Sequence, residues 1–198
     1  MMKIKRADVE YPSILKRNHK TWGKEYQAKK EANNTYRFVW KTRNQQTIDK
    51  HIIPILRDLT HSHCSYCDAY PMGPKLENTI DHFRPKELFP LLVYVWANLF
   101  LCCRNCQKRL TTFNKKLLLK PDKIDFDFHK YFIVNYVTGE IEPNPKASVQ
   151  EREQATYTIN AFRFNEFDRP TCRLEEIMAY DNSNNKNTGD YSYRFLFA

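Results

Sequence analysis

The chain has 198 residues and a net charge of +9, with 32 Lys and Arg residues against 23 Asp and Glu residues. This length predicts one domain, or one domain with an appendage. The surplus of cations fits a polyanionic partner such as nucleic acid, although many basic proteins bind nothing acidic. No apolar run reaches about 18 residues, which excludes a membrane-spanning helix of ordinary length.

The start of the chain bears on its location. It reads Met-Met-Lys-Ile-Lys-Arg, and no apolar segment follows, so we expect no signal peptide and a cytoplasmic protein without a membrane partner. In a reducing compartment, paired cysteines bind metal more often than they form disulfides. The cysteines are therefore considered first as metal ligands.

Residues 1–60 are predicted to form a basic N-terminal segment with helices. The lysines are scattered, which favours a solvated face over an arm that follows phosphates. Between residues 46 and 60, isoleucines and leucines recur at intervals of three and four, as an amphipathic helix requires. Pro54 lies inside this pattern and is expected to kink the helix or to begin a new one.

Residues 61–120 are predicted to form the centre of the fold. A short strand over 78–84 leads through an apolar loop into a second strand over 98–103. A helix of two or three turns is expected next, with Leu110 and Phe113 facing inward. The order of these elements is strand, loop, strand, helix.

Residues 121–198 are predicted to form a hairpin, helices and a tail that pack on this centre. The Thr138-Gly139 turn joins two strand candidates, and a Ser-x-x-Glu capping box at Ser148 opens a helix. Aromatic residues alternate with other types over 191–197. That tail is expected to dock either on the body of the protein or on another protein. The predicted class is α+β.

Four of the cysteines form two Cys-x-x-Cys pairs. Cys64 and Cys67 make the first pair, Cys103 and Cys106 make the second, and 35 residues separate them. Each pair lets two thiolates reach one ion from a tight turn, and four thiolates satisfy the tetrahedral preference of zinc. The spacing therefore predicts one structural Zn²⁺ held by these four residues.

Other potential metal ligands lie near these pairs or far from them. His61 and His63 precede the first pair, but four thiolates already satisfy zinc. We interpret both histidines as local surface groups or as neighbours of the ligands. Cys102 is interpreted as a buried strand residue, and Cys172 as a plain core thiol.

Polar residues lie between the two cysteine pairs, in an order typical of one nuclease family. Asp81-His82 comes first and Asn98 follows. Flanked by Cys-x-x-Cys pairs, this order resembles the HNH endonucleases, which have the ββα-metal fold. The runs 81–86 and 96–99 resemble PtuB-type proteins more narrowly, and the whole resemblance covers residues 64–107.

The resemblance implies a fold and a function. It implies a ββα-metal core over residues 61–120 with a zinc knuckle of four cysteines, and metal-dependent hydrolysis of phosphodiester bonds in DNA or RNA, including tRNA. PtuB-type proteins are the partners of PtuA ATPases in Septu-type anti-phage systems, so a toxic effector controlled by such an ATPase is implied. In retron-associated systems, a reverse transcriptase with its RNA–DNA product is a further partner.

The resemblance also assigns catalytic roles to three residues. His82 takes the proton of the attacking water, because a neutral imidazole titrates near physiological pH. Asp81 binds a catalytic Mg²⁺ or Mn²⁺, and the amide of Asn98 bridges loop backbone and holds His82 in place. In a regular strand Asp81 and His82 point to opposite faces, so a kink is needed for both to face one phosphate.

One position departs from the family. After the last cysteine the family has Asn or His as the second ligand of the catalytic ion, and this chain has Gln107. The Gln amide oxygen is a suitable hard ligand, but the side chain is one methylene longer. This predicts a weak metal site, or one that a partner orders. The lysine often found three residues later is Leu110 here.

Basic residues flank the predicted site. They are expected to contact phosphates of the nucleic acid, and neutralising any one should weaken binding broadly. For Arg84 and Lys86 the alternative is an ion pair with a local carboxylate such as that of Glu87. The four residues are Arg84, Lys86, Lys108 and Arg109.

Two functions from different classes stay open. The first is the metal-dependent nuclease described above. The second is a zinc-stapled module that binds nucleic acid or protein without catalysis, which Gln107 supports. A structural adaptor for an ATPase is compatible with either.

Overall fold

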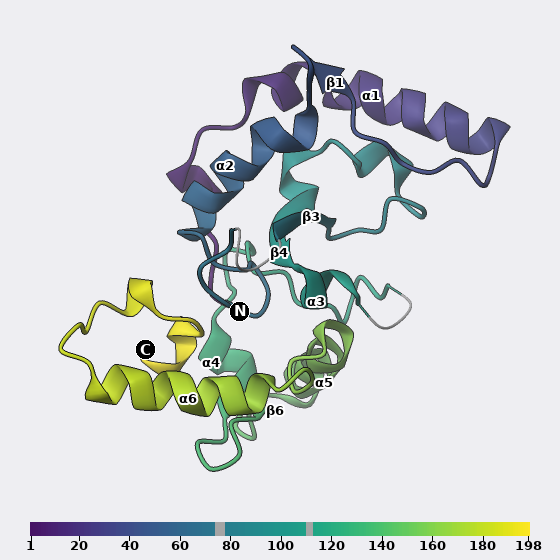
Figure 1. The fold of residues 1–198 in the computed structure, drawn as a ribbon. Helices are drawn as coiled ribbons and strands as arrows, with labels where there is room; N and C mark the ends of the chain where they lie inside the picture. The colour runs from purple at the N-terminus through teal and green to yellow at the C-terminus, as the bar shows by residue number, and fades with distance from the viewer. Residues whose placement is uncertain (74–77, 110–112) are drawn as a thin grey trace.

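The computed structural model describes residues 1–73, 78–109 and 113–198. Within these ranges the chain combines helices with three two-stranded antiparallel sheets, so the predicted α+β class is confirmed (Figure 1). Two halves meet at a waist in this view. Helices α1 (Ser13–Ala32) and α2 (Ile48–Thr60) lie in the half that holds the hairpin of β3 (Asn78–His82) and β4 (Leu99–Cys103). The other half holds α4 (Phe128–Tyr131), α5 (Val149–Phe162) and α6 (Arg169–Asn182).

The N-terminal half is built on two helices with a small hairpin between them. Its elements are α1 (Ser13–Ala32), β1 (Thr42–Arg43), β2 (Gln46–Thr47) and α2 (Ile48–Thr60), after a 3-10 turn at Arg6–Asp8. The helix expected over 46–60 is present as α2, and its buried face carries Ile52, Leu56 and Leu59. Pro54 does not begin a new helix. It lies on the exposed face, where water can reach the carbonyl that it leaves unpaired.

The central hairpin pairs β3 (Asn78–His82) with β4 (Leu99–Cys103), so both predicted strands are confirmed. His82 lies opposite Leu99, and every residue of β4 is buried. The loop between the strands contains two 3-10 turns, η2 (Pro90–Leu92) and η3 (Trp96–Asn98). The loop thus returns the chain to the sheet edge at Asn98.

Helix α3 (Arg104–Gln107) follows β4 directly but has a single turn, so the prediction of two or three turns is wrong. Lys108 at its C-cap has φ −79° and ψ 47°, which breaks the helical path. Leu110, predicted to face inward from this helix, lies outside the described residues. Strand, strand and short helix nevertheless follow one another in the predicted order.

The C-terminal half contains the predicted hairpin and two longer helices. Its elements are α4 (Phe128–Tyr131), β5 (Phe132–Val134), β6 (Ile141–Pro143), α5 (Val149–Phe162), α6 (Arg169–Asn182), η4 (Thr188–Asp190) and η5 (Arg194–Leu196). The capping box is present, because the Ser148 hydroxyl accepts from the Glu151 N–H and the Glu151 carboxylate accepts from the Ser148 N–H. Gly139 has φ +76°, and a Cβ there would meet the backbone of Pro170.

The C-terminal tail packs on the protein itself. Phe195 is fully buried, and its ring stacks on Phe128 with 4.2 Å between centroids. Tyr193 and Leu196 are buried as well. The alternating aromatic pattern therefore fills this chain's own core, and the alternative of docking on another protein is not needed to explain it.

One cluster of buried apolar residues connects the parts. It includes Leu15 and Leu56 from the N-terminal half, Phe100 from the hairpin, and Phe132 and Phe162 from the C-terminal half. The division at residues 60 and 120 stays a prediction. Among the described helices, none has an apolar stretch sufficient to cross a lipid bilayer.

Candidate functional site

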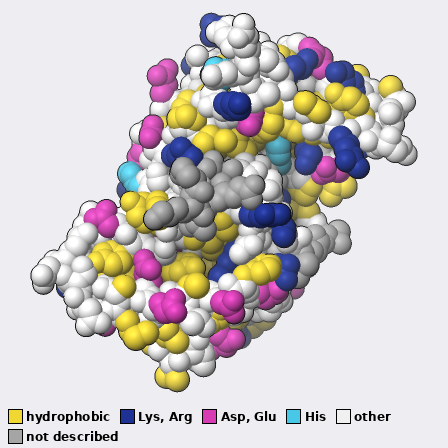
Figure 2. Space-filling model, in the orientation of Figure 1, with side chains coloured by type: hydrophobic (Ala, Val, Ile, Leu, Met, Phe, Trp, Pro, Cys, Tyr) yellow, Lys and Arg dark blue, Asp and Glu magenta, His cyan; other side chains and the backbone are white. Residues whose placement is uncertain are grey.

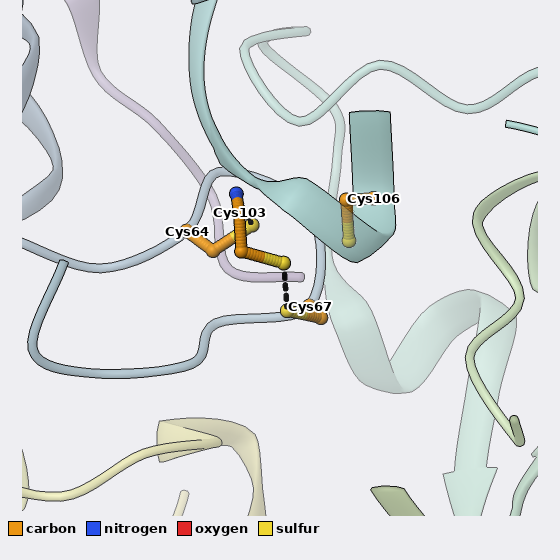
Figure 3. A group of neighbouring side chains, drawn as sticks. All are labelled: Cys64, Cys67, Cys103 and Cys106. Atoms are coloured by element: carbon orange, nitrogen blue, oxygen red, sulfur yellow. Dashed lines mark hydrogen bonds between the residues drawn. The ribbon is translucent and has the colours of Figure 1, made fainter. Parts of the chain in front are cut away.

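The four paired cysteines converge in the interior. Their Sγ atoms all lie within 4.8 Å of one another, and the Sγ atoms of Cys67 and Cys103 are 3.7 Å apart (Figure 3). In a tetrahedral zinc site with Zn–S bonds of about 2.3 Å, neighbouring sulfurs are about 3.8 Å apart. A disulfide requires about 2.0 Å. The donor set therefore fits a zinc ion.

Three elements bring these sulfurs together. Cys64 and Cys67 lie in the turn that follows α2, Cys103 ends β4, and Cys106 lies in α3 (Figure 3). The turn is tied to β4, because the Ser65 N–H donates to the carbonyl of Leu101 over 2.9 Å. The Cys103 N–H lies 3.4 Å from the Cys64 Sγ, in the geometry of a bond that stabilises a thiolate.

A buried arginine faces the cysteine cluster. The Arg169 side chain donates to Cys106 Sγ over 3.2 Å and to Cys103 Sγ over 3.7 Å. Burial opposes the charge of this guanidinium, but the neighbouring cysteines outweigh burial and raise the pKa of Arg169. Four thiolates with one divalent ion carry a net charge of −2, so Arg169 offsets part of an excess negative charge in a dry environment.

The turn that holds the first pair is also secured by the tail. Asp68 is 1% exposed, and Arg194 pairs with it, with Nη2 at 2.6 Å from Oδ1 and Nε at 3.1 Å from Oδ2. The Tyr193 N–H donates to the Asp68 carbonyl over 2.9 Å. The bidentate contact fixes the residue next to Cys67.

The remaining potential ligands take other roles. Neither His61 nor His63 belongs to the cluster. His61 is exposed, as one of the two interpretations had it. His63 is fully buried, stacked on Tyr70 and bonded at Nε2 to the Tyr191 carbonyl, so for His63 the surface alternative is wrong and the alternative of a neighbour of the ligands is left. Cys102 is buried as predicted, whereas Cys172 is exposed and is not a core thiol.

A pocket of about 530 Å³ opens at the end of β3. Asp81 and His82 both line it, together with Gln107 and Arg109. Asp81 and His82 are each 7% exposed, so the pocket reaches them through a narrow part of their surfaces. Two of the three residues to which the resemblance assigns catalytic roles thus border the same space, although they are neighbours in a strand; Asn98 does not line it.

The hydrogen bond of His82 defines which ring nitrogen is basic. Its Nε2 lies 2.9 Å from the carbonyl oxygen of Val93, which can only accept, so Nε2 carries the proton. Burial lowers the pKa of His82 to about 4, although Asp81 opposes this. The ring is therefore neutral at pH 7, and Nδ1 holds the free lone pair.

An aromatic wall from the N-terminal half surrounds the same imidazole. Trp40 stacks on the His82 ring with 5.6 Å between centroids, and Phe38 meets it edge-on at 5.3 Å. Both rings also line the pocket. The segment that precedes α2 therefore contributes directly to the site and holds the imidazole plane.

The carboxylate of Asp81 already has two partners. The Tyr66 hydroxyl donates to its Oδ2 over 2.7 Å, and Arg109 Nη2 lies 3.1 Å from Oδ2. Burial by itself would lower the pKa of Arg109. The charge of Asp81, together with smaller contributions from other groups nearby, outweighs burial and raises this pKa. Arg109 also donates to the carbonyls of His82 and Phe83.

Asn98 bridges backbone groups of the loop after β3. Its Oδ1 accepts from the Arg84 N–H over 2.8 Å, and its Nδ2 donates to the carbonyls of Arg84 and Leu92. Leu92 is followed by Val93, whose carbonyl accepts the hydrogen bond from the Nε2–H of His82. This amide therefore holds the loop that orients the imidazole, the contact expected of it.

The other predicted residues differ in what they touch. The Gln107 amide nitrogen donates to the Thr79 hydroxyl over 2.9 Å at the exposed rim of the pocket. Lys86 lies 3.4 Å from Glu87, the ion pair considered as the alternative to a nucleic-acid contact. The Arg84 guanidinium carbon lies 5.7 Å from the centroid of the Phe89 ring, and Lys108 is exposed. Figure 2 shows how Lys and Arg side chains are distributed over one face of the molecule.

Sequence reasoning missed several residues of the site. Arg169 carried no signal, because nothing in its local sequence marks a cation beside sulfur. Trp40 and Phe38 lie in an aromatic segment, Tyr-Arg-Phe-Val-Trp, whose alternation was a usable sign of one buried face. Tyr66 lies between the first two cysteines, where a buried hydroxyl points to a polar partner.

Comparison with known proteins supports part of the resemblance. No protein-family model matches the chain. Over 61 residues the chain is 30% identical to the Septu protein PtuB of Bacillus thuringiensis. The matched stretch is 31% of this chain and 24% of that relative, so the similarity spans about a quarter of the relative's length. Over that stretch, the chain is similar to a PtuB protein of a Septu system.

Proposed function

We propose that this protein is a metal-dependent HNH-type endonuclease with a ββα-metal core, acting as the effector of an anti-phage defence system. The observation that carries the proposal is that Asp81 and His82, at the end of β3, border one pocket of a hairpin whose second strand ends in the cysteine cluster. A neutral base beside a carboxylate ligand for a hard cation suits phosphodiester hydrolysis. The similarity to PtuB supports the defence role.

In this proposal His82 is the general base. Nδ1 accepts the proton of the attacking water, since Nε2 is committed to the Val93 carbonyl. A base whose pKa is about 4 is weak, but the negative charge of a bound phosphodiester favours the imidazolium form and strengthens it. Asn98 keeps the loop of Val93 in place during the transfer.

Asp81 and Gln107 are the residues that would hold a Mg²⁺ or Mn²⁺ in this pocket. When bound, such a cation stabilises negative charge on the phosphoryl oxygens and on the leaving oxygen. Asp81 is paired with Arg109, and Gln107 is turned to Thr79. Ligation by Asp81 therefore requires its contact with Arg109 to loosen, which supports a weak site that a partner orders, whereas the bond to Thr79 uses the Gln107 amide nitrogen and leaves the amide oxygen available.

Arg84, Lys86 and Lys108 are proposed to contact phosphates around the pocket. Arg109 is not kept in this group. Its guanidinium is directed at Asp81 and at two backbone carbonyls, and its side chain is 15% exposed. Arg109 is better described as a positioning residue for Asp81 and His82.

The test is cleavage of supercoiled DNA, single-stranded RNA and tRNA with Mg²⁺ or Mn²⁺. His82→Ala should lower the rate at least about 100-fold while the fold stays intact. His129→Ala is the matched control, because His129 is exposed and does not line the pocket. Equal rates for the parent and His82→Ala would refute the assignment.

A second candidate function is a zinc-stapled binding module without catalysis. The engagement of Asp81 by Tyr66 and Arg109 favours it, because a satisfied carboxylate has no need of a metal ion. The same assay separates the two functions. A protein that retards nucleic acid in a gel but cleaves none of the three substrates, with either ion, is the module.

The partners are proposed from the similarity to PtuB. A PtuA-type ATPase would control the activity, and a reverse transcriptase with its RNA–DNA product would join in a retron-associated system. Co-purification with the products of neighbouring genes tests this assembly. We expect weak cleavage by the isolated chain and stronger cleavage in the complex; full activity of the isolated chain would contradict control by a partner.

A further inference from the structure

A second cavity, of about 300 Å³, opens beside the loop that follows β3. Its lining shares no residue with that of the catalytic pocket. Four cations line it, and none of the described residues that line it is acidic. The cations come from two separate segments and are Arg84, Lys115, Lys120 and Lys123.

The cavity keeps an excess of positive charge. The Asp122 carboxylate contacts one of these cations, with Oδ1 at 3.0 Å from the Lys120 Nζ. The same carboxylate pairs with Arg6, with Oδ2 at 2.5 Å from Nε. One negative charge thus faces two positive charges before Arg84 is considered. Burial lowers the pKa of Lys120, Asp122 opposes this, and the charges of Arg6 and Arg84 lower it further.

Apolar side chains share the lining of the cavity with the cations. They are Leu92, Val95 and Leu118, and Leu118 is 4% exposed. A bare inorganic ion gains nothing from these apolar surfaces. A phosphate ester that carries a sugar and a base can place its charge on the cations and its rings on the apolar surface.

The cavity lies close to the reacting residues. Phe83 and Arg84, which line it, directly follow Asp81 and His82, and two residues of chain span at most about 7 Å. A neighbouring hollow shares Arg109 with the catalytic pocket and Leu118 with this cavity. A nucleic-acid strand that enters the pocket can therefore reach the cavity with an adjoining nucleotide.

We propose that this cavity binds a backbone phosphate of the same nucleic-acid strand whose phosphodiester bond enters the catalytic pocket. The inference rests on the proposed function. Arg84 offers a planar fork of donors for two phosphate oxygens, and the lysines act as point charges. Lys115, Lys120 and Lys123 become binding residues through this cavity, although they lie outside the cysteine motifs in sequence.

The test compares two double variants with the same loss of charge. Lys115→Gln with Lys123→Gln removes two cations of the cavity, and both residues are exposed, so the fold is preserved. Lys116→Gln with Lys146→Gln removes two cations outside it. A labelled 20-nucleotide single strand, AMP and inorganic phosphate are titrated separately onto the parent and both doubles, without added divalent ion.

The expected result is weaker binding of the oligonucleotide by the cavity double alone. The magnitude of the slope of log affinity against log salt should fall by up to about 0.7, the value for one lost phosphate contact on a single strand. Identical curves for the two doubles would overturn the proposal. If the cavity double loses only AMP binding and binds the oligonucleotide as the parent does, the cavity does not bind a nucleic-acid strand, and it is a site for free nucleotides instead. Because the readout is binding rather than cleavage, an inactive nuclease leaves this outcome unaffected.

Discussion

The cysteine cluster and the pocket of Asp81 and His82 both contain potential metal ligands, but only those of the cluster are free to bind an ion without breaking an ion pair within the protein. In the cluster, four buried sulfurs face one point, and Arg169 stands beside them. In the pocket, the carboxylate of Asp81 is turned to Tyr66 and Arg109. The first region presents donors that a divalent cation would satisfy, and the second has its charge satisfied by the protein. One region is suited to permanent ligation and the other to conditional ligation.

The difference shows how one hairpin can separate stability from activity. A closed site of four thiolates contributes its binding free energy to folding. In the pocket, the carboxylate is already paired with a guanidinium, so binding a cation in the resting state gains little free energy. The two kinds of behaviour lie within one short structural unit, because β4 leads into the cluster while β3 ends at the pocket.

The largest expected effect is the loss of zinc. Cys106→Ser should abolish cooperative thermal unfolding, because a structural zinc contributes roughly 10 kcal/mol or more, comparable with the whole stability of a domain. Cys172→Ser is the control, since this thiol is exposed, and should change stability by less than about 0.5 kcal/mol. Circular dichroism and metal analysis provide the measurements. A Cys106→Ser protein that melts like the parent would remove the cluster from the comparison.

The next effect concerns the buried cation of the cluster. Arg169→Met should lower the free energy of unfolding by about 3–5 kcal/mol, because it leaves thiolate charge buried without its partner. Arg37→Met makes the same change at an exposed arginine and should be nearly neutral. Urea titration of zinc-loaded protein gives both values. If the two variants unfold at the same urea concentration, Arg169 does not balance the cluster.

In the pocket, the effect of removing one partner of Asp81 should be smaller. Tyr66→Phe removes a hydrogen bond to a charged acceptor and should cost about 1.5–3 kcal/mol of unfolding free energy. Tyr180→Phe serves as the control, because its ring stacks on Phe197 and keeps that contact. Urea titration again measures both. A cost for Tyr66→Phe no larger than that of its control would mean that Asp81 does not depend on the hydroxyl.

The smallest effect on stability is expected at Gln107. Gln107→Asn shortens an exposed side chain and should change the unfolding free energy by less than about 0.5 kcal/mol. It should nevertheless tighten Mn²⁺ binding by the pocket, measured by calorimetry, because Asn has the shorter side chain that the resemblance to HNH endonucleases implies for this ligand. Gln150→Asn, on the exposed face of α5, is the control. Unchanged Mn²⁺ affinity would show that Gln107 is not what weakens the site.

Local sequence patterns predicted the central part of the fold. The two strands, the capping box at Ser148 and the two cysteine pairs each depend on residues within a few positions of one another. The contacts of Asn98 are also fairly local, since its partners lie 6 and 14 residues away. Such features can be predicted from the sequence because short segments of the chain determine their geometry.

Features that depend on distant partners were not predictable. Arg169 lies 63 residues from Cys106, and Trp40 reaches His82 from another helix–strand unit. Cys172 is predicted to be a core thiol because free cysteines are among the most buried residue types. Helix α6 instead buries Arg169 and Arg173, which donate to backbone carbonyls and, in the case of Arg169, to sulfur.

The pairing of Asp68 with Arg194 also has a consequence for the order of folding events. This contact joins residues 126 positions apart, whereas the contact between Cys64 and Cys103 joins residues 39 apart. Closing the longer loop costs about 1 kcal/mol more chain entropy. The cysteines can therefore come together before the C-terminal tail has docked, and the tail then fixes a metal-binding turn that has already formed. The difference in chain entropy thus favours a route on which the metal-binding turn forms first and Asp68 is covered last.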